Sequence, residues 1–251
     1  MEYPCFEQEL VDKINRLMDE WKKVATGEFT TDGFYPYYTQ QKYRILFIGR
    51  ESRGLSGCDY ISVLHDAYKQ CRIGGRHLNK DLFHRRILYL AYGLLNNFPT
   101  WEKVPYPNQM TSTFATSEGI SFAFMNISKI SNETDDFHSN WSSIQTSKGD
   151  AITKKRNFLQ EEISLLAPDI IIGSGVYDIH NIIESGEKLF QNQWLSLYLL
   201  KIASKNVLYF ATYHFTATKI EKGIGVKDYD SFYLPIKDTF LKYCYYVDEK
   251  K

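Results

Sequence analysis

Hydrophobic positions along the chain form two patterns, short continuous runs and longer stripes. Four runs are almost entirely apolar, as in strands buried on both faces of a parallel sheet, and they cover residues 43–49, 122–126, 169–173 and 207–211. Apolar residues three or four positions apart, the spacing of an amphipathic helix, mark residues 6–26, 82–95, 157–166, 194–203 and 233–245. We interpret the polar stretch 128–153, which carries Trp141, as a long surface loop.

The alternation of buried strands with helices predicts the fold class. Parallel strands need crossover connections, which are right-handed and usually helical, so this order favours a three-layer α/β/α sandwich. Its central sheet is expected to be short, mainly parallel and four-stranded. A length of 251 residues suits one hydrophobic core. We therefore expect a single domain over residues 1–251, with the N-terminal helix at about 6–26 packed on the core.

Composition narrows the class of protein. Hydrophobic residues make up 43% and charged residues 24% of the chain, which excludes wholesale disorder. No apolar stretch has the length of a membrane span, and the N-terminus lacks the pattern of a signal peptide. The four cysteines are too far apart for a zinc or iron–sulfur motif, so we expect reduced thiols and no metal or other cofactor. These features predict a cytoplasmic protein without a membrane partner, and we expect a monomer.

Charge is balanced overall but uneven along the chain. Thirty basic residues match thirty acidic ones, whereas the stretch from Lys42 to Arg86 holds ten basic and four acidic residues, a local excess of +6. Such a segment can gather phosphate groups on one face of a protein. It can equally form a solvated helical face whose charges pair with acidic neighbours in space, and the sequence leaves both interpretations open.

Four polar segments follow the predicted strands. They cover residues 49–57, 126–129, 173–175 and 213–218. Ligands of open α/β sheets bind beyond the carboxyl ends of the strands, so these segments are the candidate site. In the first, Glu51 lies between Arg50 and Arg53 on a glycine-bounded turn. The arginines favour an ionised carboxylate that could orient water; a structural Arg–Glu pair that closes the loop is the alternative.

The other candidate residues come from the later strands. Asn126 can offer a donor and an acceptor to the edge of a planar ligand, or it can brace a loop. Lys129 can contact a phosphate or extend into solvent. His214 can donate to an oxygen that gains negative charge. We place the remaining histidines on the surface or in loops, namely His65, His77, His84, His138 and His180.

Taken together, these segments resemble the uracil-DNA glycosylase superfamily, and among its members the uracil-DNA glycosylase-like proteins of bacteria. The first strand ends in Gly49-Arg50-Glu51, the second in Asn126-Ile127-Ser128-Lys129, the third begins after Leu166-Ala167-Pro168-Asp169, and His214 follows the fourth. The order and spacing match over roughly residues 40–245. Ser52-Arg53 stands where the family has Pro-Tyr, and Phe215-Thr216 where it has Pro-Ser.

The resemblance implies roles for these residues. Glu51 would position the attacking water, and His214 would hydrogen-bond the leaving base. Gly49, Arg50 and Asn126 would contact the base, with Asn126 distinguishing uracil from cytosine. Phosphate or DNA contacts fall to Arg53, Lys129, Ser174 and Thr216. Four aromatic residues are candidates to stack on the base, namely Tyr60, Tyr68, Phe83 and Trp101.

The implied function is that of a DNA-repair enzyme. It would hydrolyse the N-glycosidic bond of uracil, or of a related damaged base, after that base is flipped out of DNA. DNA is then the expected partner. The altered motifs and the zero net charge keep a second interpretation open, in which the same fold binds a nucleic acid, a nucleotide or a free nucleobase without cleaving it.

Overall fold

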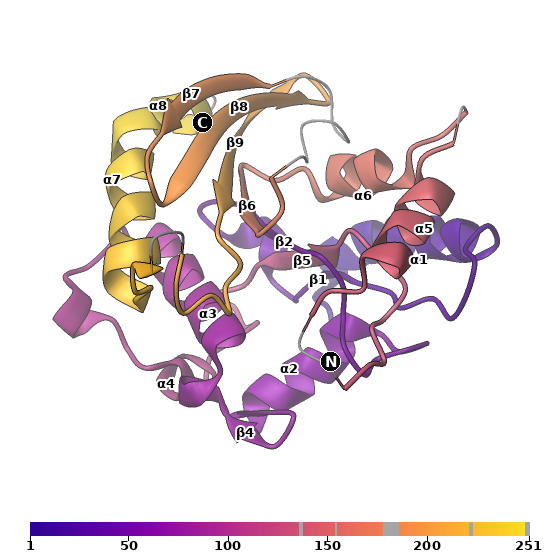
Figure 1. Cartoon of the computed structure of the whole chain (residues 1–251), viewed down its shortest axis with the longest axis horizontal. Coiled ribbons are helices and arrows are strands. Elements are labelled where there is room, and N and C mark those ends of the chain that lie inside the picture. Colours follow the sequence, from indigo (N-terminus) through magenta and orange to yellow (C-terminus); the bar gives the residue numbers. More distant parts are fainter. Residues whose placement is uncertain (136–137, 154, 178–185, 221–222, 249–251) are drawn as a thin grey trace.

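A computed structural model describes residues 1–135, 138–153, 155–177, 186–220 and 223–248 (Figure 1). Within this part of the chain the fold is α/β, as predicted, but the central sheet is mixed and has seven strands, so the prediction of a four-stranded sheet is wrong. In spatial order the strands are β1 (Gly33–Phe34), β5 (Ala123–Asn126), β2 (Ile45–Gly49), β6 (Ile170–Ser174), β9 (Lys205–Thr212), β8 (Leu195–Ile202) and β7 (Glu187–Gln191).

The four predicted strands form the parallel centre of the sheet. β5, β2, β6 and β9 are parallel neighbours, whereas β1, β8 and β7 add antiparallel edges. Every residue of β2, β5 and β6 is buried. The register places Gly49 opposite Asn126 and Gly173 opposite Ala211. The carboxyl ends of these strands therefore meet at one edge of the sheet.

Helices cover both faces of the sheet. One hydrophobic cluster joins α1 and α6 to one face, and another joins α2, α3 and α7 to the other; Figure 1 shows α1, α5 and α6 grouped on one side. The longer helices are α1 (Gln8–Lys22), α2 (Tyr60–Lys69), α3 (Leu82–Leu95), α5 (Trp141–Ala151), α6 (Phe158–Leu166) and α7 (Leu234–Tyr243).

Short elements complete the described chain. They are the helices α4 (Pro107–Met110) and α8 (Tyr245–Asp248), the hairpin of β3 (Arg72–Ile73) and β4 (Arg76–His77), a π-helical turn at Tyr229–Tyr233, and 3₁₀ turns at Cys5–Glu7, Tyr38–Gln40, Leu78–Lys80 and Trp101–Lys103. All four cysteines are free thiols. Within the described residues, no helix combines the length and apolar character that crossing a bilayer requires.

The helix predicted at 194–203 is a strand, and this prediction is wrong. β8 pairs with β9 along its whole length, and the two residues that join them, Ala203 and Ser204, both have positive φ (48° and 68°). Two positive φ angles are typical of the tight type I′ hairpin turn, which usually carries Asn-Gly or Asp-Gly. Because neither dipeptide occurs here, the sequence gives no sign of a hairpin turn. The spacing of the leucines in this segment fits a helix as well as a strand.

The long surface loop predicted at 128–153 is also wrong in part, because α5 lies within it. Asn140 caps this helix by accepting a hydrogen bond from the Ser143 backbone N–H (3.1 Å). Only Ile144, Ser147 and Ala151 are buried along α5, so its apolar stripe is too weak to stand out in the sequence. Trp141, at the start of the helix, is exposed as predicted.

Candidate functional site

A cavity of about 760 Å³ lies beyond the carboxyl ends of the parallel strands. Its walls come from the loop after β2, one face of α2, the β3–β4 hairpin, the start of α3, the segment before α5 and the loop after β9. Of the predicted site residues, Arg50, Glu51, Arg53, His214 and Thr216 line it. A cavity of this size therefore lies at the edge of the sheet where the sequence predicts that ligands bind.

The loop that carries Glu51 is held by the segment after β5. Backbone hydrogen bonds run from Ile127 N–H to Gly49 O (3.0 Å) and from Ser128 N–H to Arg50 O (2.8 Å). Further along, Asn132 N–H donates to Ser52 O (2.8 Å). The two segments thus continue the pairing of β2 and β5 beyond the sheet, which fixes the backbone on both sides of Glu51.

One carboxylate oxygen of Glu51 is anchored and the other is not. Oε1 accepts from Asn132 Nδ2 (3.0 Å) and from the backbone N–H of Asn140 (3.1 Å), the N-cap of α5. Oε2 is buried without a hydrogen-bond partner among the described residues. The positive end of a helix favours a negative charge at this point. Two amides rather than an arginine hold Glu51, so the alternative of a structural Arg–Glu pair is not what the geometry shows.

Two more buried polar atoms near this loop lack partners within the described chain. They are the hydroxyl of Ser52 and Nδ2 of Asn126. An unpaired buried polar group costs roughly 1–3 kcal/mol, and Glu51 and Ser52 both line the cavity, so their unpaired atoms favour a polar ligand at this end of it. Asn126 does not brace a loop through its side chain, which leaves its amide available.

Asn126 nevertheless lies behind the cavity rather than in its wall. Its side chain covers Gly49, where an added Cβ would sit 2.6 Å from Asn126 Oδ1. Its backbone N–H donates to Asp32 Oδ2 (2.7 Å). Gly49 is therefore required for close packing of these two strand ends, and a ligand must penetrate past the Glu51 loop to reach the amide.

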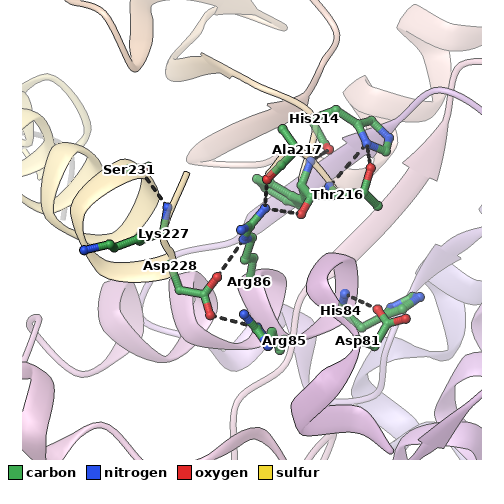
Figure 2. A network of polar contacts seen from close by, with 12 residues as sticks. Asp81, His84, Arg85, Arg86, His214, Thr216, Ala217, Lys227, Asp228 and Ser231 are labelled. Atoms are coloured by element: carbon green, nitrogen blue, oxygen red, sulfur yellow. Dashed lines mark hydrogen bonds and ion pairs between the residues drawn. The ribbon is translucent and has the colours of Figure 1, made fainter. Parts of the chain in front are cut away.

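His214 has a defined tautomer. Its Nδ1 accepts from the backbone N–H of Thr216 (3.3 Å) and lies 2.7 Å from Thr216 Oγ1 (Figure 2). Because a backbone N–H can only donate, the neutral ring carries its proton on Nε2. Burial, reinforced by Arg50 and Arg86, lowers the pKa of His214 to about 4. The ring is therefore a neutral hydrogen-bond donor at physiological pH.

Arg50 links the Glu51 loop to the loop after β6 and to the start of α5. Its Nε donates to Gly175 O (2.9 Å), and its guanidinium lies 5.0 Å from the ring centre of Trp141. An added Cβ at Gly175, which has a φ of 65°, would come within 2.8 Å of Arg50 Nη2 and 3.0 Å of His214 Cβ. Glycine is thus required where Arg50 and His214 approach each other. Burial lowers the pKa of Arg50.

Aromatic rings form one wall of the cavity. Tyr60 stacks on Phe124 with ring centres 4.8 Å apart, and Phe83 lies 6.1 Å from Phe124 and 5.5 Å from His214. Tyr60 and Phe83 line the cavity, whereas the other two stacking candidates, Tyr68 and Trp101, do not. Figure 2 shows Asp81 and His84 at the start of α3, below the His214 loop; both also line the cavity.

Two of the predicted phosphate contacts are buried in the protein interior. The Lys129 side chain is 1% exposed and its ammonium pairs with Asp32 and with Glu162 Oε2 (2.9 Å). The hydroxyl of Ser174 accepts from the Phe215 backbone N–H (2.9 Å). Neither side chain can reach a phosphate, because both are enclosed and engaged. Lys129 stabilises the interior instead, and Ser174 positions the His214 loop.

Arg53 and Thr216 are exposed at the rim of the cavity. Arg53 donates to the carbonyl oxygens of Thr134 (3.1 Å) and His138 (3.2 Å). From the basic stretch 42–86, Arg50, Arg53 and Arg76 line the cavity, while Arg85 and Arg86 bind Asp228. Pairing with an acidic neighbour is thus what Arg85 and Arg86 do, whereas phosphate binding by the three arginines at the cavity stays a prediction.

The placement of two further histidines was predicted wrongly. His65 and His84 are buried, since they face the core from α2 and α3, and burial lowers the pKa of His84 to about 4. His84 Nδ1 lies 2.8 Å from the hydroxyl of Tyr68. His77 and His138 are exposed as predicted, and His180 lies outside the described residues.

Sequence reasoning did not identify the residue that holds the His214 loop. Arg86, on α3, is buried and donates through Nη1 to Phe215 O (2.5 Å) and Ala217 O (2.9 Å), and through Nε to Asp228 Oδ1 (2.7 Å) (Figure 2). Its guanidinium also lies 4.6 Å from the Phe232 ring centre. The sequence analysis counted Arg86 only as part of the basic stretch 42–86, and its partners lie more than 120 residues away in the chain, so no local pattern indicates this role.

We expect Arg86→Lys to loosen the His214 loop. A lysine ammonium lacks the planar fork that serves two carbonyls and a carboxylate together, so stability should fall by roughly 1–2 kcal/mol. Urea unfolding measures this loss, with Lys80→Arg as the control, because Lys80 is exposed. Unchanged stability would show that the network around Arg86 is redundant.

The fold and the site together define an α/β protein with a cavity at the carboxyl edge of its parallel strands. In the part of the chain that the structure describes, no three His, Cys, Asp or Glu side chains are grouped as metal ligands would be. Comparisons with protein-family models, with curated proteins and with solved structures found no match to this chain. The function proposed below therefore rests on the residues and on their geometry.

Proposed function

We propose that the protein is a DNA glycosylase-like hydrolase, which cleaves the N-glycosidic bond of a uracil or related base flipped out of DNA. The observation that carries the proposal is the Glu51 carboxylate. Its Oε1 is held by two hydrogen bonds, and its buried Oε2 has no hydrogen-bond partner among the described residues. It lines the same cavity as the neutral His214. The sequence resemblance to the uracil-DNA glycosylase superfamily agrees with this pairing.

The chemistry follows from these two groups. As the glycosidic bond breaks, positive charge grows on the sugar and negative charge on the base. Glu51 Oε2 orients the attacking water and stabilises the sugar cation. His214 Nε2–H donates to the base oxygen that becomes anionic, which a neutral imidazole does without releasing its proton. Tyr60 and Phe83 offer ring faces for the flipped base.

The test is alkaline strand scission of a labelled oligonucleotide with one uracil, offered single- and double-stranded. The proposal expects scission at the uracil by the wild-type protein and a loss of at least about a hundredfold in His214→Ala, the usual cost of removing one such donor. Thr218→Ala serves as the control on the same loop. Equal scission by wild type and His214→Ala contradicts the assignment.

The protonation of His214 in acid is a separate prediction. An ordinary histidine is protonated near pH 6.5, but His214 stays neutral to about pH 4 because of burial, Arg50 and Arg86. We expect no inflection near pH 6.5 in the titration of its ring NMR signal, and a shift only toward pH 4. Since the unfolded chain binds this proton first, folding stability should decline as the pH falls from about 6.5 to about 4. A ring titration centred at 6.5 contradicts the prediction.

A second candidate function is binding of a free nucleobase or nucleoside without cleavage. The buried positions of Lys129 and Ser174 favour it, because they remove two of the expected contacts to a DNA backbone. Under this alternative the uracil oligonucleotide stays intact, and free uracil raises the melting temperature of the wild-type protein but not that of Glu51→Gln. The scission assay and this thermal shift therefore separate the two functions.

A further inference from the structure

The cavity extends far beyond the polar end that Glu51 and His214 form. One face of α2 lines it, with Tyr60, Val63, Leu64 and Ala67 at intervals of three, one and three residues. Such residues lie on one side of a helix, and seven residues span about 10 Å along its axis. Val63 is 39% exposed although it is apolar. The helix therefore presents an incompletely covered apolar face to the cavity.

Residues of the β3–β4 hairpin and of α3 close this region from other sides. We use the name apolar arm for the part of the cavity lined by Val63, Leu64, Ala67, Ile73 and Leu82. Figure 1 places the hairpin beside α2, and the two elements pack directly on each other. The charged residues that also line the cavity near here, Arg76 and Asp81, have opposite signs. The arm as a whole suits an uncharged group.

The base that the proposed function places in the cavity fills only part of it. Each non-hydrogen atom of a bare pyrimidine occupies no more than the share of one water in the liquid, roughly 30 Å³. Uracil therefore fills less than about a third of the 760 Å³. A volume of this size instead falls in the range of roughly 300–1,000 Å³ that encloses most of a larger organic ligand.

Two aromatic side chains of the cavity wall pack on one buried ring. Phe83 and Tyr60 line the cavity, and Phe124 lies behind them, with ring centres 6.1 Å from Phe83 and 4.8 Å from Tyr60; the His214 ring is 5.5 Å from Phe83. Tyr60 is the first residue of α2, whose lining face leads into the apolar arm. A planar ligand held at Glu51 can thus also contact the rings of Phe83 and Tyr60 on the way to the apolar arm.

We infer that the preferred substrate is a nucleobase enlarged by an uncharged apolar substituent, which occupies the apolar arm while the base itself lies between Glu51 and His214. This inference rests on the proposed function for the reaction at the polar end. The substituent gains stabilisation by leaving water for a site lined by aliphatic side chains. Bare uracil leaves the arm to solvent and is the poorer substrate.

The experiment compares two oligonucleotides that differ only in the substituent meant to occupy the apolar arm. One carries uracil, and the other carries 5-phenyluracil at the same position. We expect kcat/KM to be at least about tenfold higher for 5-phenyluracil, the order of selectivity that an apolar pocket provides. Ala67→Phe fills the arm and should abolish this preference. Lys69→Phe adds the same ring at an exposed position of α2 that does not line the cavity, and it should keep the preference.

Val63→Phe is a second filling variant, placed where partial exposure tolerates a larger side chain; it covers the case in which Ala67→Phe does not fold. A wild-type protein that prefers uracil, or a preference that survives both filling variants, overturns the inference while leaving the proposed function in place.

If the protein cleaves neither oligonucleotide, the proposed function is contradicted. Thermal unfolding of the protein in the presence of free uracil or free 5-phenyluracil then tests the inference by itself. Stabilisation by 5-phenyluracil but not by uracil, lost in Ala67→Phe or Val63→Phe, supports an apolar arm that binds an enlarged base. No stabilisation of the wild-type protein by 5-phenyluracil overturns it.

Discussion

Glu51→Gln should lower base excision by roughly two to four orders of magnitude without destabilising the fold, as removal of a positioned catalytic base does. The glutamine keeps an acceptor for Asn132 Nδ2 and the Asn140 backbone N–H, which hold Oε1 in the wild-type protein. It replaces Oε2, which has no hydrogen-bond partner in the wild-type protein, by an uncharged NH₂ group that cannot accept a proton from water. Single-turnover scission of the uracil oligonucleotide measures the effect.

The control for this variant is Glu133→Gln. Glu133 is an exposed carboxylate on the loop beside Glu51, where it accepts from the Ser56 backbone N–H (3.2 Å), and it does not line the cavity. Its replacement should leave the rate within about twofold. If Glu51→Gln cleaves as fast as the wild-type protein, Glu51 is not the catalytic carboxylate, and a hydrolase that depends on it is excluded.

Lys129→Met should lower the free energy of unfolding by roughly 3–5 kcal/mol, the cost of leaving a buried charge without its partner. Asp32, Lys129 and Glu162 are each buried, and the lysine is the cation that both carboxyl groups contact. Burial acts to lower the pKa of Lys129, but the two carboxyl groups outweigh it and the net shift is upward. Burial and the nearby Asp32 raise the pKa of Glu162 well above its usual value.

Urea unfolding at neutral pH measures the loss, and Lys13→Met is the control, because the Lys13–Glu9 pair is exposed and contributes little. The difference between wild type and Lys129→Met should narrow in acid, since the pKa of Glu162 is raised and protonation of this carboxyl group removes its unpaired negative charge. A loss below about 1 kcal/mol would show that the interior adapts to the missing cation.

The effect of Lys129 should also reach the site. Asp32 accepts from Lys129 through Oδ1 and from the Asn126 backbone N–H through Oδ2 (2.7 Å). The segment that follows Lys129 carries Asn132, whose amide holds Glu51. The buried ion pairs therefore support the strand end and the loop on which the candidate catalytic carboxylate depends, although none of their side chains lines the cavity.

The sequence by itself determined the parallel centre of the sheet and the edge at which the site lies. β2, β5, β6 and β9 are buried on both faces, so their apolar character is continuous and can be recognised without knowledge of their neighbours. α3 matches its predicted bounds of 82–95, and the Asp81 side chain caps its start by accepting from the His84 backbone N–H (2.9 Å). Glu51 and His214 follow such strands, which is why local pattern and chain order were enough to bring them to one cavity.

Tertiary structure alone decided what the other polar residues do. Lys129 follows a strand as Glu51 does, and only the packing of α1 and α6 encloses it with Asp32 and Glu162. β8 has leucines that fit a helix, and its pairing with β9 makes it a strand. Asn140 and Arg86 reach the site from distant segments. Burial, pairing partners and the volume of the cavity depend on contacts between residues far apart in the chain, and no local pattern of the sequence contains them.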